Sequence, residues 1–83
     1  MGTLKVSVIS PEATLFEGEA PSLVAPAFDG EVGILPSHAP MVTTLGKGTL
    51  RIGEGGASFA VEGGFLQVVD DVVRVVTEKA ARA

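Results

Sequence analysis

The chain of 83 residues lacks cysteine, tryptophan and tyrosine, and it contains a single histidine. Without cysteine there is no disulfide to stabilise the fold and no thiolate to act as a nucleophile or a metal ligand. The lone histidine, His38, could hold a transition metal only together with several carboxylates, and it could catalyse only beside a nucleophile or a second acid–base group. We therefore expect no catalytic and no metal-binding residue in this chain.

Basic residues are also few and scattered, with six against ten acidic ones and a net charge of −4. The four phenylalanines have neighbours such as Glu17, Asp29 and Glu62 rather than bases, unlike an RNA-binding sheet. No apolar run approaches the ~20 residues of a membrane span. The N-terminus has neither a signal-peptide core nor an Arg-rich transit character. These features predict no nucleic-acid partner, no membrane insertion, and a place in the cytosol or facing an organelle matrix.

Glycine-rich segments at residues 53–56 and 61–64 resemble phosphate-binding loops only in composition. Neither is followed by Lys-Ser or Lys-Thr, and neither opens a helix whose N-terminus could hold a phosphate. Hairpin turns explain both segments better. Asp70 and Asp71 likewise suit a tight turn and lack the ligand pattern of a calcium loop. We expect no cofactor.

The positive signal in the sequence is a series of short β-strand patterns. Apolar and polar residues alternate from Leu4 to Val8, which is the period of a half-buried strand. Asp70 and Asp71 provide a two-residue turn between two valine-rich runs. Because the length suits one domain, we predict an all-β fold, a flattened antiparallel β-sandwich or barrel over residues 1–76. The further strand candidates are residues 15–25, 41–45, 49–52, 58–62, 65–69 and 72–76.

Residues 77–83 differ from the rest because they alone have helix-forming composition. Seven residues cannot hold an isolated helix in water, so we expect a C-terminal tail there. Apolar residues make up 46% of the chain, and we expect two or three of the phenylalanines in the core. Part of the apolar surface should remain outside the core, where another chain can cover it.

Residues 30–40, Gly-Glu-Val-Gly-Ile-Leu-Pro-Ser-His-Ala-Pro, form the most informative segment. Two prolines fix the backbone and two glycines permit tight turns. We predict a rigid surface loop that Ile34 and Leu35 anchor in the core, with Glu31 at the tip of a turn. A loop that holds its shape at a surface usually serves a partner.

The same segment looks like the Gly-Glu-x-Gly-Ile-x-Pro-x-His-Ala-Pro loop of the epsilon subunit of rotary F-type ATP synthases, named delta in mitochondria. Further blocks at matching spacing extend the resemblance over nearly the whole chain. Four ordered blocks are a strong signal, whereas any one alone would be weak. The other blocks are Val-Ile-Ser-Pro-Glu at 8–12 with Leu-Phe-Glu-Gly-Glu-Ala at 15–20, Val-Glu-Gly-Gly-Phe at 61–65, and Val-Val-Arg-Val-Val at 72–76.

This resemblance implies a flattened β-sandwich of about this length, followed by a C-terminal helical hairpin. The chain ends at Ala83, where that hairpin would begin, so it is either a natural short form or a truncated one. In the family the hairpin is associated with inhibition of ATP hydrolysis and, in some members, with ATP binding. We expect this chain by itself to do neither.

The resemblance further implies a non-catalytic rotor subunit in the central stalk of a proton-translocating ATP synthase. It would bind the gamma subunit with one face and the c-ring with one end, helping to couple ring rotation to ATP synthesis. As part of the F1 sector it would lie peripherally at the cytoplasmic face of the bacterial inner membrane, or at the equivalent organelle face. Apart from the resemblance, the apolar character of the chain leaves self-association open when its partners are missing. The residues carried over toward gamma are Ser10, His38, Ala39, Met41 and Thr43, and those toward the c-ring are Asp29, Gly30, Glu31 and Val32.

An alternative of a different class remains open, a small ligand-binding or hydrolytic β-domain with a cleft around His38. It requires Ser37, Ser10 or Asp29 to lie beside His38 in space. Replacing His38 by alanine would then abolish activity on a small substrate, whereas the stalk hypothesis predicts only weaker assembly. A biotin-carrier-like module is disfavoured because Lys47 lies between two glycines and not at a Met-Lys-Met-like hairpin tip.

Overall fold

The computed structural model describes residues 2–53 and 56–82, which form eight β-strands. The all-β prediction is confirmed. In this part of the chain no helix is long and apolar enough to cross a membrane. The predicted turn at 53–56 lies partly outside the described residues. The strands are β1 (Leu4–Ile9), β2 (Thr14–Ala20), β3 (Leu23–Ala27), β4 (Gly30–Ile34), β5 (Met41–Thr44), β6 (Lys47–Ile52), β7 (Ser58–Val69) and β8 (Val72–Arg82).

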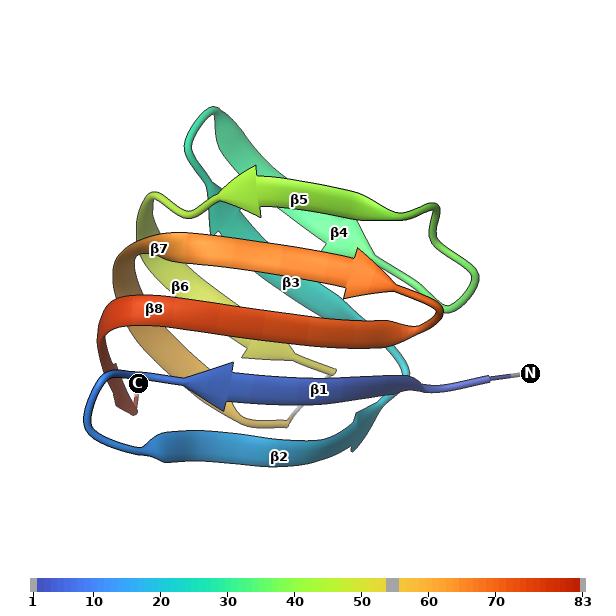
Figure 1. The fold of residues 1–83 in the computed structure, drawn as a ribbon, viewed down its shortest axis with the longest axis horizontal. Helices are drawn as coiled ribbons and strands as arrows, with labels where there is room; N and C mark the ends of the chain where they lie inside the picture. Colours follow the sequence, from blue (N-terminus) through green and yellow to red (C-terminus); the bar gives the residue numbers. More distant parts are fainter. Residues whose placement is uncertain (1, 54–55, 83) are drawn as a thin grey trace.

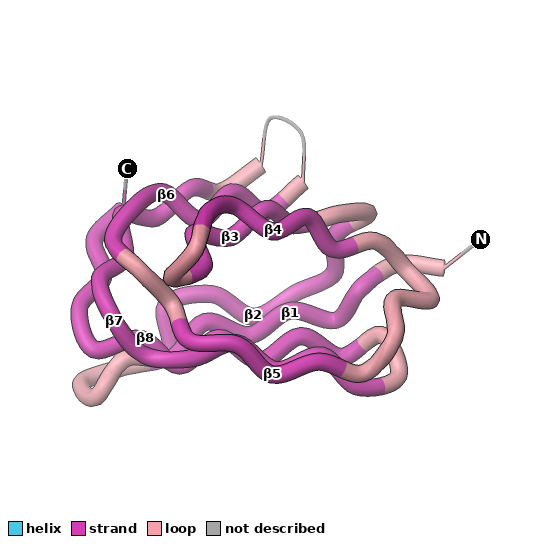
Figure 2. Tube along the Cα trace, turned by 90° about the horizontal axis from the view of Figure 1, so that it is seen from above, coloured by secondary structure: helices cyan, strands magenta, loops and turns pink. Residues whose placement is uncertain are grey.

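One hydrogen-bonded sheet folds over on itself to make two layers (Figures 1 and 2). The strand order is β2-β1-β8-β7-β6-β3-β4, and β5 pairs separately with β7. The front layer of Figure 1 contains β5, β1, β2 and the adjoining halves of β7 and β8, while β6, β3 and β4 lie behind it. The described pairs are antiparallel except β1 with β8, which is parallel.

Strand β7 links the two layers. Its first half pairs with β6 and its second half with β5, while β8 follows it along the other edge. The bend between the halves falls at Gly63 and Gly64, with φ of +76° and +101°. Glycine has no Cβ and adopts such angles without a steric penalty. These glycines bend one continuous strand, so the hairpin turn expected at residues 61–64 is wrong.

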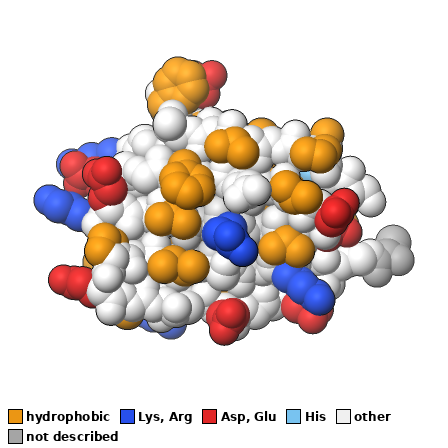
Figure 3. Space-filling model, viewed as in Figure 1, with side chains coloured by type: hydrophobic (Ala, Val, Ile, Leu, Met, Phe, Trp, Pro, Cys, Tyr) orange, Lys and Arg blue, Asp and Glu red, His pale blue; other side chains and the backbone are white. Residues whose placement is uncertain are grey.

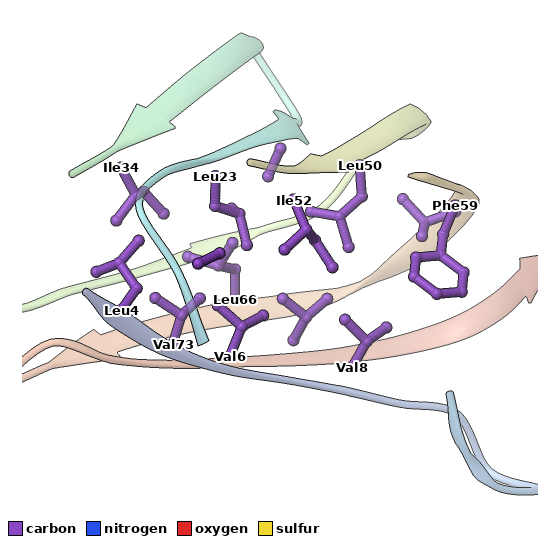
Figure 4. Packing of buried hydrophobic residues seen from close by; sticks show 14 of the residues in the cluster. Leu4, Val6, Val8, Leu23, Ile34, Leu50, Ile52, Phe59, Leu66 and Val73 are labelled. Atoms are coloured by element: carbon purple, nitrogen blue, oxygen red, sulfur yellow. The ribbon is translucent and has the colours of Figure 1, made fainter. Parts of the chain in front are cut away.

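The core fills the space between the layers, as Figure 4 shows. Strand alternation supplies it: Leu4, Val6 and Val8 of β1 point inward, as do Val73 and Val75 of β8. The Thr77 hydroxyl, also buried, donates a 2.8 Å hydrogen bond to the carbonyl of Lys79. The remaining buried hydrophobic residues are Ala20, Leu23, Ala25, Ile34, Leu45, Leu50, Ile52, Phe59, Val61, Leu66 and Val68.

Phenylalanines divide between the core and the surface. Phe59 is buried, and Phe16 packs edge-on against it with the ring centroids 6.5 Å apart. The guanidinium of Arg82 lies 5.4 Å from the centre of the Phe59 ring, within the range of a cation–π contact. Phe28 and Phe65 are exposed. Two of the four rings therefore serve the core, and the other two face solvent.

The segment predicted as one rigid loop, residues 30–40, is only partly a loop. Residues 30–34 form β4, which pairs antiparallel with β3 along its whole length. Its glycines concealed this strand, because tertiary pairing outweighed their weak β-propensity. Ile34 is buried as predicted, but Leu35 is 62% exposed, so the second predicted anchor is wrong. Glu31 lies within the strand opposite Pro26, and not at the tip of a turn.

The sheet also extends beyond its predicted end at Val76. Strand β8 runs to Arg82, and its residues 79–82 pair with residues 59–62 of β7. The helix-forming composition of this segment did not decide its structure, because pairing along β7 replaces the hydrogen bonds that a single helical turn would make. The expectation of a tail after Val76 is therefore wrong for residues 77–82. By contrast, the two-residue turn is confirmed, since Asp70 and Asp71 both have positive φ, 51° and 64°.

Candidate interaction surface

The outward side of β5, β7, β8 and β1 carries an unusual number of exposed apolar side chains (Figure 3). Val42 is 68% exposed, and Phe65, Val69 and Val72 are each about 40% exposed. Such a contiguous patch on a small domain marks an interaction surface. We call it the front face, defined by Lys5, Ser7, Ile9, Val42, Thr44, Phe65, Gln67, Val69, Val72, Arg74 and Val76.

Strand register explains why these residues share one side. Val42 lies opposite Gln67, which lies opposite Arg74, and Arg74 lies opposite Ser7 of β1. Directly paired residues point to the same side of a sheet, and every second residue follows them. The alternation that buries Val73 and Val75 thus places their neighbours outward. Hydrophobic residues on both faces of β7 and β8 were the sequence signal for this surface.

One end of the front face is bordered by the loop of residues 35–40, which contains His38 (Figure 1). The amide of His38 donates to the carbonyl of Leu35 at 3.1 Å, and His38 Nδ1 lies 2.7 Å from the carbonyl oxygen of Ala39. Ser37 has a φ of 72°, which is uncommon for a residue with a Cβ. Its amide donates a 2.6 Å hydrogen bond to the carboxylate of Asp71. Asp71 therefore fixes the His38 loop to the β7–β8 turn.

We expect Asp71→Gly to release this loop while leaving the turn intact, because glycine tolerates the positive φ of Asp71. Losing a hydrogen bond to a charged acceptor costs about 1.5–3 kcal/mol, so amide exchange at Ser37 should speed up roughly tenfold or more. Exchange measured by NMR tests this. Asp71→Asn is the control, since it retains an acceptor oxygen and should stay near wild type. Unchanged amide exchange at Ser37 in Asp71→Gly would show that the hydrogen bond to Asp71 does not hold the loop in place.

The residues carried over toward gamma do not form one cluster. Ser10 lies in the β1–β2 turn, where its backbone and hydroxyl bond to Ala13, at the end of the molecule opposite the His38 loop. Met41 and Thr43 pair with the buried Val68 and Leu66, so their side chains point to the inner side of β5. Ala39 is exposed in the loop. The sequence predicted apolar surface outside the core without locating it; the front face is that surface, and it connects the two ends.

A second feature is the β3–β4 turn, which projects at the top of Figure 1. Phe28 in this turn is 72% exposed, Asp29 is exposed, and Gly30 has a φ of 131°. We call residues 28–30 the tip. The prediction named Asp29 and Gly30 but missed Phe28, although an aromatic residue before Asp-Gly was the available signal.

The other two residues predicted at this end lie on β4. Glu31 is exposed, and its Oε1 lies 3.6 Å from Nη2 of Arg51 on β6. Val32 pairs with Ala25 and packs partly against the core. Glu31 therefore already has a basic partner within the chain, and Val32 offers only part of its surface to another molecule.

The geometry does not assemble a cleft around His38. Ser10 and Asp29 lie in turns away from the His38 loop. Four hollows on the described part of the surface are lined by other residues and not by His38. The described part of the chain also contains no group of three or more His, Cys, Asp or Glu side chains placed to hold a metal.

Residues 3–83 match the family described as ATP synthase, Delta/Epsilon chain, beta-sandwich domain. The chain belongs to this family. It is 52% identical over 80 residues to the ATP synthase epsilon chain of Leptospira borgpetersenii, covering 94% of this chain and 63% of that one. It is 46% identical over 83 residues to the epsilon chain of Desulforamulus reducens, covering 98% and 63%. This delta/epsilon-type chain thus spans less than two thirds of the length of these relatives.

Solved structures show the same fold. A chain of the Euglena gracilis mitochondrial ATP synthase, in a cryo-EM structure of OSCP/F1/c-ring in rotational state 1, aligns with a TM-score of 0.88 at 24% identity, covering 99% of this chain and 54% of that one. A chain of the Tetrahymena thermophila mitochondrial ATP synthase central stalk and c-ring aligns with a TM-score of 0.81 at 15% identity, covering 96% and 66%. The family assignment from the sequence is confirmed, and the alternative of a His38-centred hydrolytic or ligand-binding domain is not favoured.

Proposed function

We propose that this chain is a non-catalytic rotor subunit in the central stalk of a proton-translocating F-type ATP synthase. It binds gamma with its front face and the c-ring with its tip, and it helps to couple ring rotation to ATP synthesis. In this role it lies peripherally at the membrane in the F1 sector, on the cytoplasmic face in a bacterium. Membership of the delta/epsilon family supports the proposal. The observation that carries it is the apolar front face, which a stable partner would cover.

The gamma contact, in this proposal, extends along the front face from the β1–β2 turn to the His38 loop. This route explains how Ser10 and His38, at opposite ends of the molecule, can meet one partner. Ala39 is exposed at the same end as His38, while Met41 and Thr43 contribute only from the free edge of β5. The apolar centre supplies the hydrophobic core of an interface, and the polar ends supply its rim.

The c-ring contact, in this proposal, is made by Phe28, Asp29 and Gly30 at the tip, with Glu31 and Val32 behind them. The family resemblance implies an arginine in the c-ring loops, which in this proposal replaces Arg51 as the partner of Glu31. An exposed ion pair contributes only ~0–1 kcal/mol, so this exchange costs little. The exposed ring of Phe28 adds apolar contact area at the same place.

Torque between the two surfaces needs a stiff connection, and the backbone provides one. The amide of Phe28 donates to the carbonyl of Thr44 at 3.2 Å, and the amide of Gly46 donates to the carbonyl of Pro26 at 2.8 Å. A β-bridge joins Ala27 to Leu45. The tip is therefore tied directly to β5, the strand that carries Val42 of the front face. A close-packed core behind both elements limits their deformation.

The proposal is tested by calorimetric titration of this chain with purified cognate gamma and, separately, with the c-ring. We expect saturable one-to-one binding to gamma, weakened by His38→Ala and more strongly by Val42→Asp, which places a charge at the apolar centre. Binding to the c-ring should weaken in Phe28→Ala. No binding to gamma by a chain whose folding is verified by circular dichroism would refute the central-stalk function.

Glu31→Gln is expected to separate c-ring binding from stability. The Glu31–Arg51 pair is exposed on both sides, so its loss should change the free energy of unfolding by less than ~1 kcal/mol. If Glu31 accepts a hydrogen bond from a c-ring arginine, affinity for the ring should fall several-fold while affinity for gamma stays constant. Unchanged affinity for the c-ring would show that Glu31 does not take part in the contact. Glu62→Gln serves as the charge-matched control, because Glu62 lies on β7 and not at the tip.

A further inference from the structure

Arg74 is a cationic side chain placed among the apolar residues of the front face. Along β8 its outward neighbours are Val72 and Val76, and across the sheet it lies opposite Gln67 and Ser7. Figure 3 shows basic side chains among the apolar groups of this face. The apolar residues on the adjoining rows are Ile9, Val42, Phe65 and Val69.

Nothing in the described part of the chain neutralises Arg74. Within residues 2–53 and 56–82 the one ion pair joins Arg51 to Glu31, and no side-chain hydrogen bond of Arg74 is formed. The acids that line a hollow together with Arg74 are Glu17, Glu19 and Asp70. Glu17 shares with Arg74 a hollow of about 390 Å³ between β2 and β8, with the small side chain of Ser7 between them. Asp70 shares a second hollow with Arg74 at the β7–β8 turn.

Covering the front face creates an electrostatic requirement. An exposed arginine costs nothing in water, but one that is buried under a partner loses its hydration and needs an anion and hydrogen-bond acceptors. Arginine suits a carboxylate because its planar guanidinium donates two parallel hydrogen bonds. Lys5, the other base on this face, lies directly opposite Glu19 and has an acid beside it. Arg74 therefore depends on what the partner brings.

We propose, on the basis of the central-stalk function proposed above, that Arg74 is a specificity-determining residue of the gamma interface and pairs with a carboxylate of gamma. The pair fixes how gamma is oriented on an otherwise apolar surface that would tolerate sliding. The apolar residues around Arg74 exclude water from the contact, as the surroundings of interface hot spots do. Specificity then comes from the cost of leaving Arg74 unpaired in any other docking.

The test is a calorimetric titration of purified gamma with wild type, Arg74→Ala, Arg74→Lys and Arg74→Glu. We expect Arg74→Ala to weaken binding about tenfold to a hundredfold and Arg74→Glu to weaken it further. Arg74→Lys should weaken binding less than Arg74→Ala does, because the positive charge remains but the two parallel hydrogen bonds of the guanidinium are lost. Lys47→Glu is the matched control: it makes the same change in net charge on β6, away from the front face, and should leave affinity unchanged. Thermal unfolding of each variant verifies folding.

An internal partner is the competing explanation, and double-mutant cycles separate it. Glu17→Gln, Glu19→Gln and Asp70→Asn should each leave gamma affinity near wild type, and each combined with Arg74→Ala should bind as weakly as Arg74→Ala alone. If any of them reproduces the loss and its double variant is no weaker, Arg74 pairs within its own chain and the inference is wrong. If Val42→Asp disrupts binding but Arg74→Ala does not, the inference fails while the gamma contact stands. If wild type does not bind gamma, both proposals fail.

Discussion

Gly64→Ala should remove a large share of the stability of this domain. A Cβ at Gly64 would clash with the carbonyl oxygen of Val76 and would lie 2.7 Å from the Cα of Thr77, both of them backbone atoms of the neighbouring strand. The φ of +101° is also unfavourable for any residue with a side chain. We expect a loss of at least ~3 kcal/mol. At ~0.05–0.15 kcal/mol per residue, that is a large share of the total stability.

Gly64 is this sensitive because three elements meet at the bend of β7. Its carbonyl accepts a 2.9 Å hydrogen bond from the amide of Leu45, and it pairs with Thr77 of β8. A shift of β8 to accommodate the new methyl group would therefore disturb the crossing of β7 from one layer to the other. Moving these strands apart to relieve the clash would therefore cost packing energy in the close-packed interior.

Chemical denaturation of three glycine variants checks the prediction. At Gly33 nothing lies within 4 Å of an added Cβ, so Gly33→Ala should be neutral or slightly stabilising. At Gly63 the obstructing atom is the carboxylate of Glu78, which can move, and only the strain of a φ of +76° remains; we expect a loss of ~1–2 kcal/mol. Equal losses at Gly33 and Gly64 would contradict the assignment of Gly64 as the critical position.

Local sequence signals predicted the fold where one strand or turn decides the structure. Alternation identified β1, and two adjacent acids identified the β7–β8 turn. Prediction failed where the composition of a segment and its strand pairing disagree. Residues 30–34 have the glycine content of a loop but become a strand opposite β3, and residues 77–82 have the composition of a helix but pair with β7. Both partner strands directly precede these segments in the chain, so the errors came from reading composition and not from a long separation between the paired strands.

The residues of the candidate site also fall into two groups, those that a local motif predicted and those that it did not. A family motif led to His38 and Glu31, because a motif is a local string. The front face could not be read locally, since it combines single residues from β1, β5, β7 and β8 whose register only the folded sheet defines. In valine-rich strands that are apolar on both sides, the sequence does not say which side faces the core, so it did not place Phe65 and Val72 on the outer side.

Phe65 and Leu66 offer the strongest test of that division, because adjacent residues of β7 point to opposite sides. Leu66 is fully buried, whereas Phe65 is 41% exposed on the front face. Leu66→Ala should lower the free energy of unfolding by ~2–5 kcal/mol. Phe65→Ala removes a larger side chain but should cost much less stability, because part of its surface already contacts water.

Binding to gamma should show the reverse order. Phe65→Ala is expected to weaken binding tenfold or more if its ring lies in the interface. Leu66→Ala, measured below its transition temperature, should bind within about threefold of wild type, because Leu66 contacts no partner. The two variants thus separate stability from recognition at neighbouring positions. A gamma affinity that simply follows the loss of stability in both variants would mean that the front face acts only through the fold, and that gamma is held elsewhere.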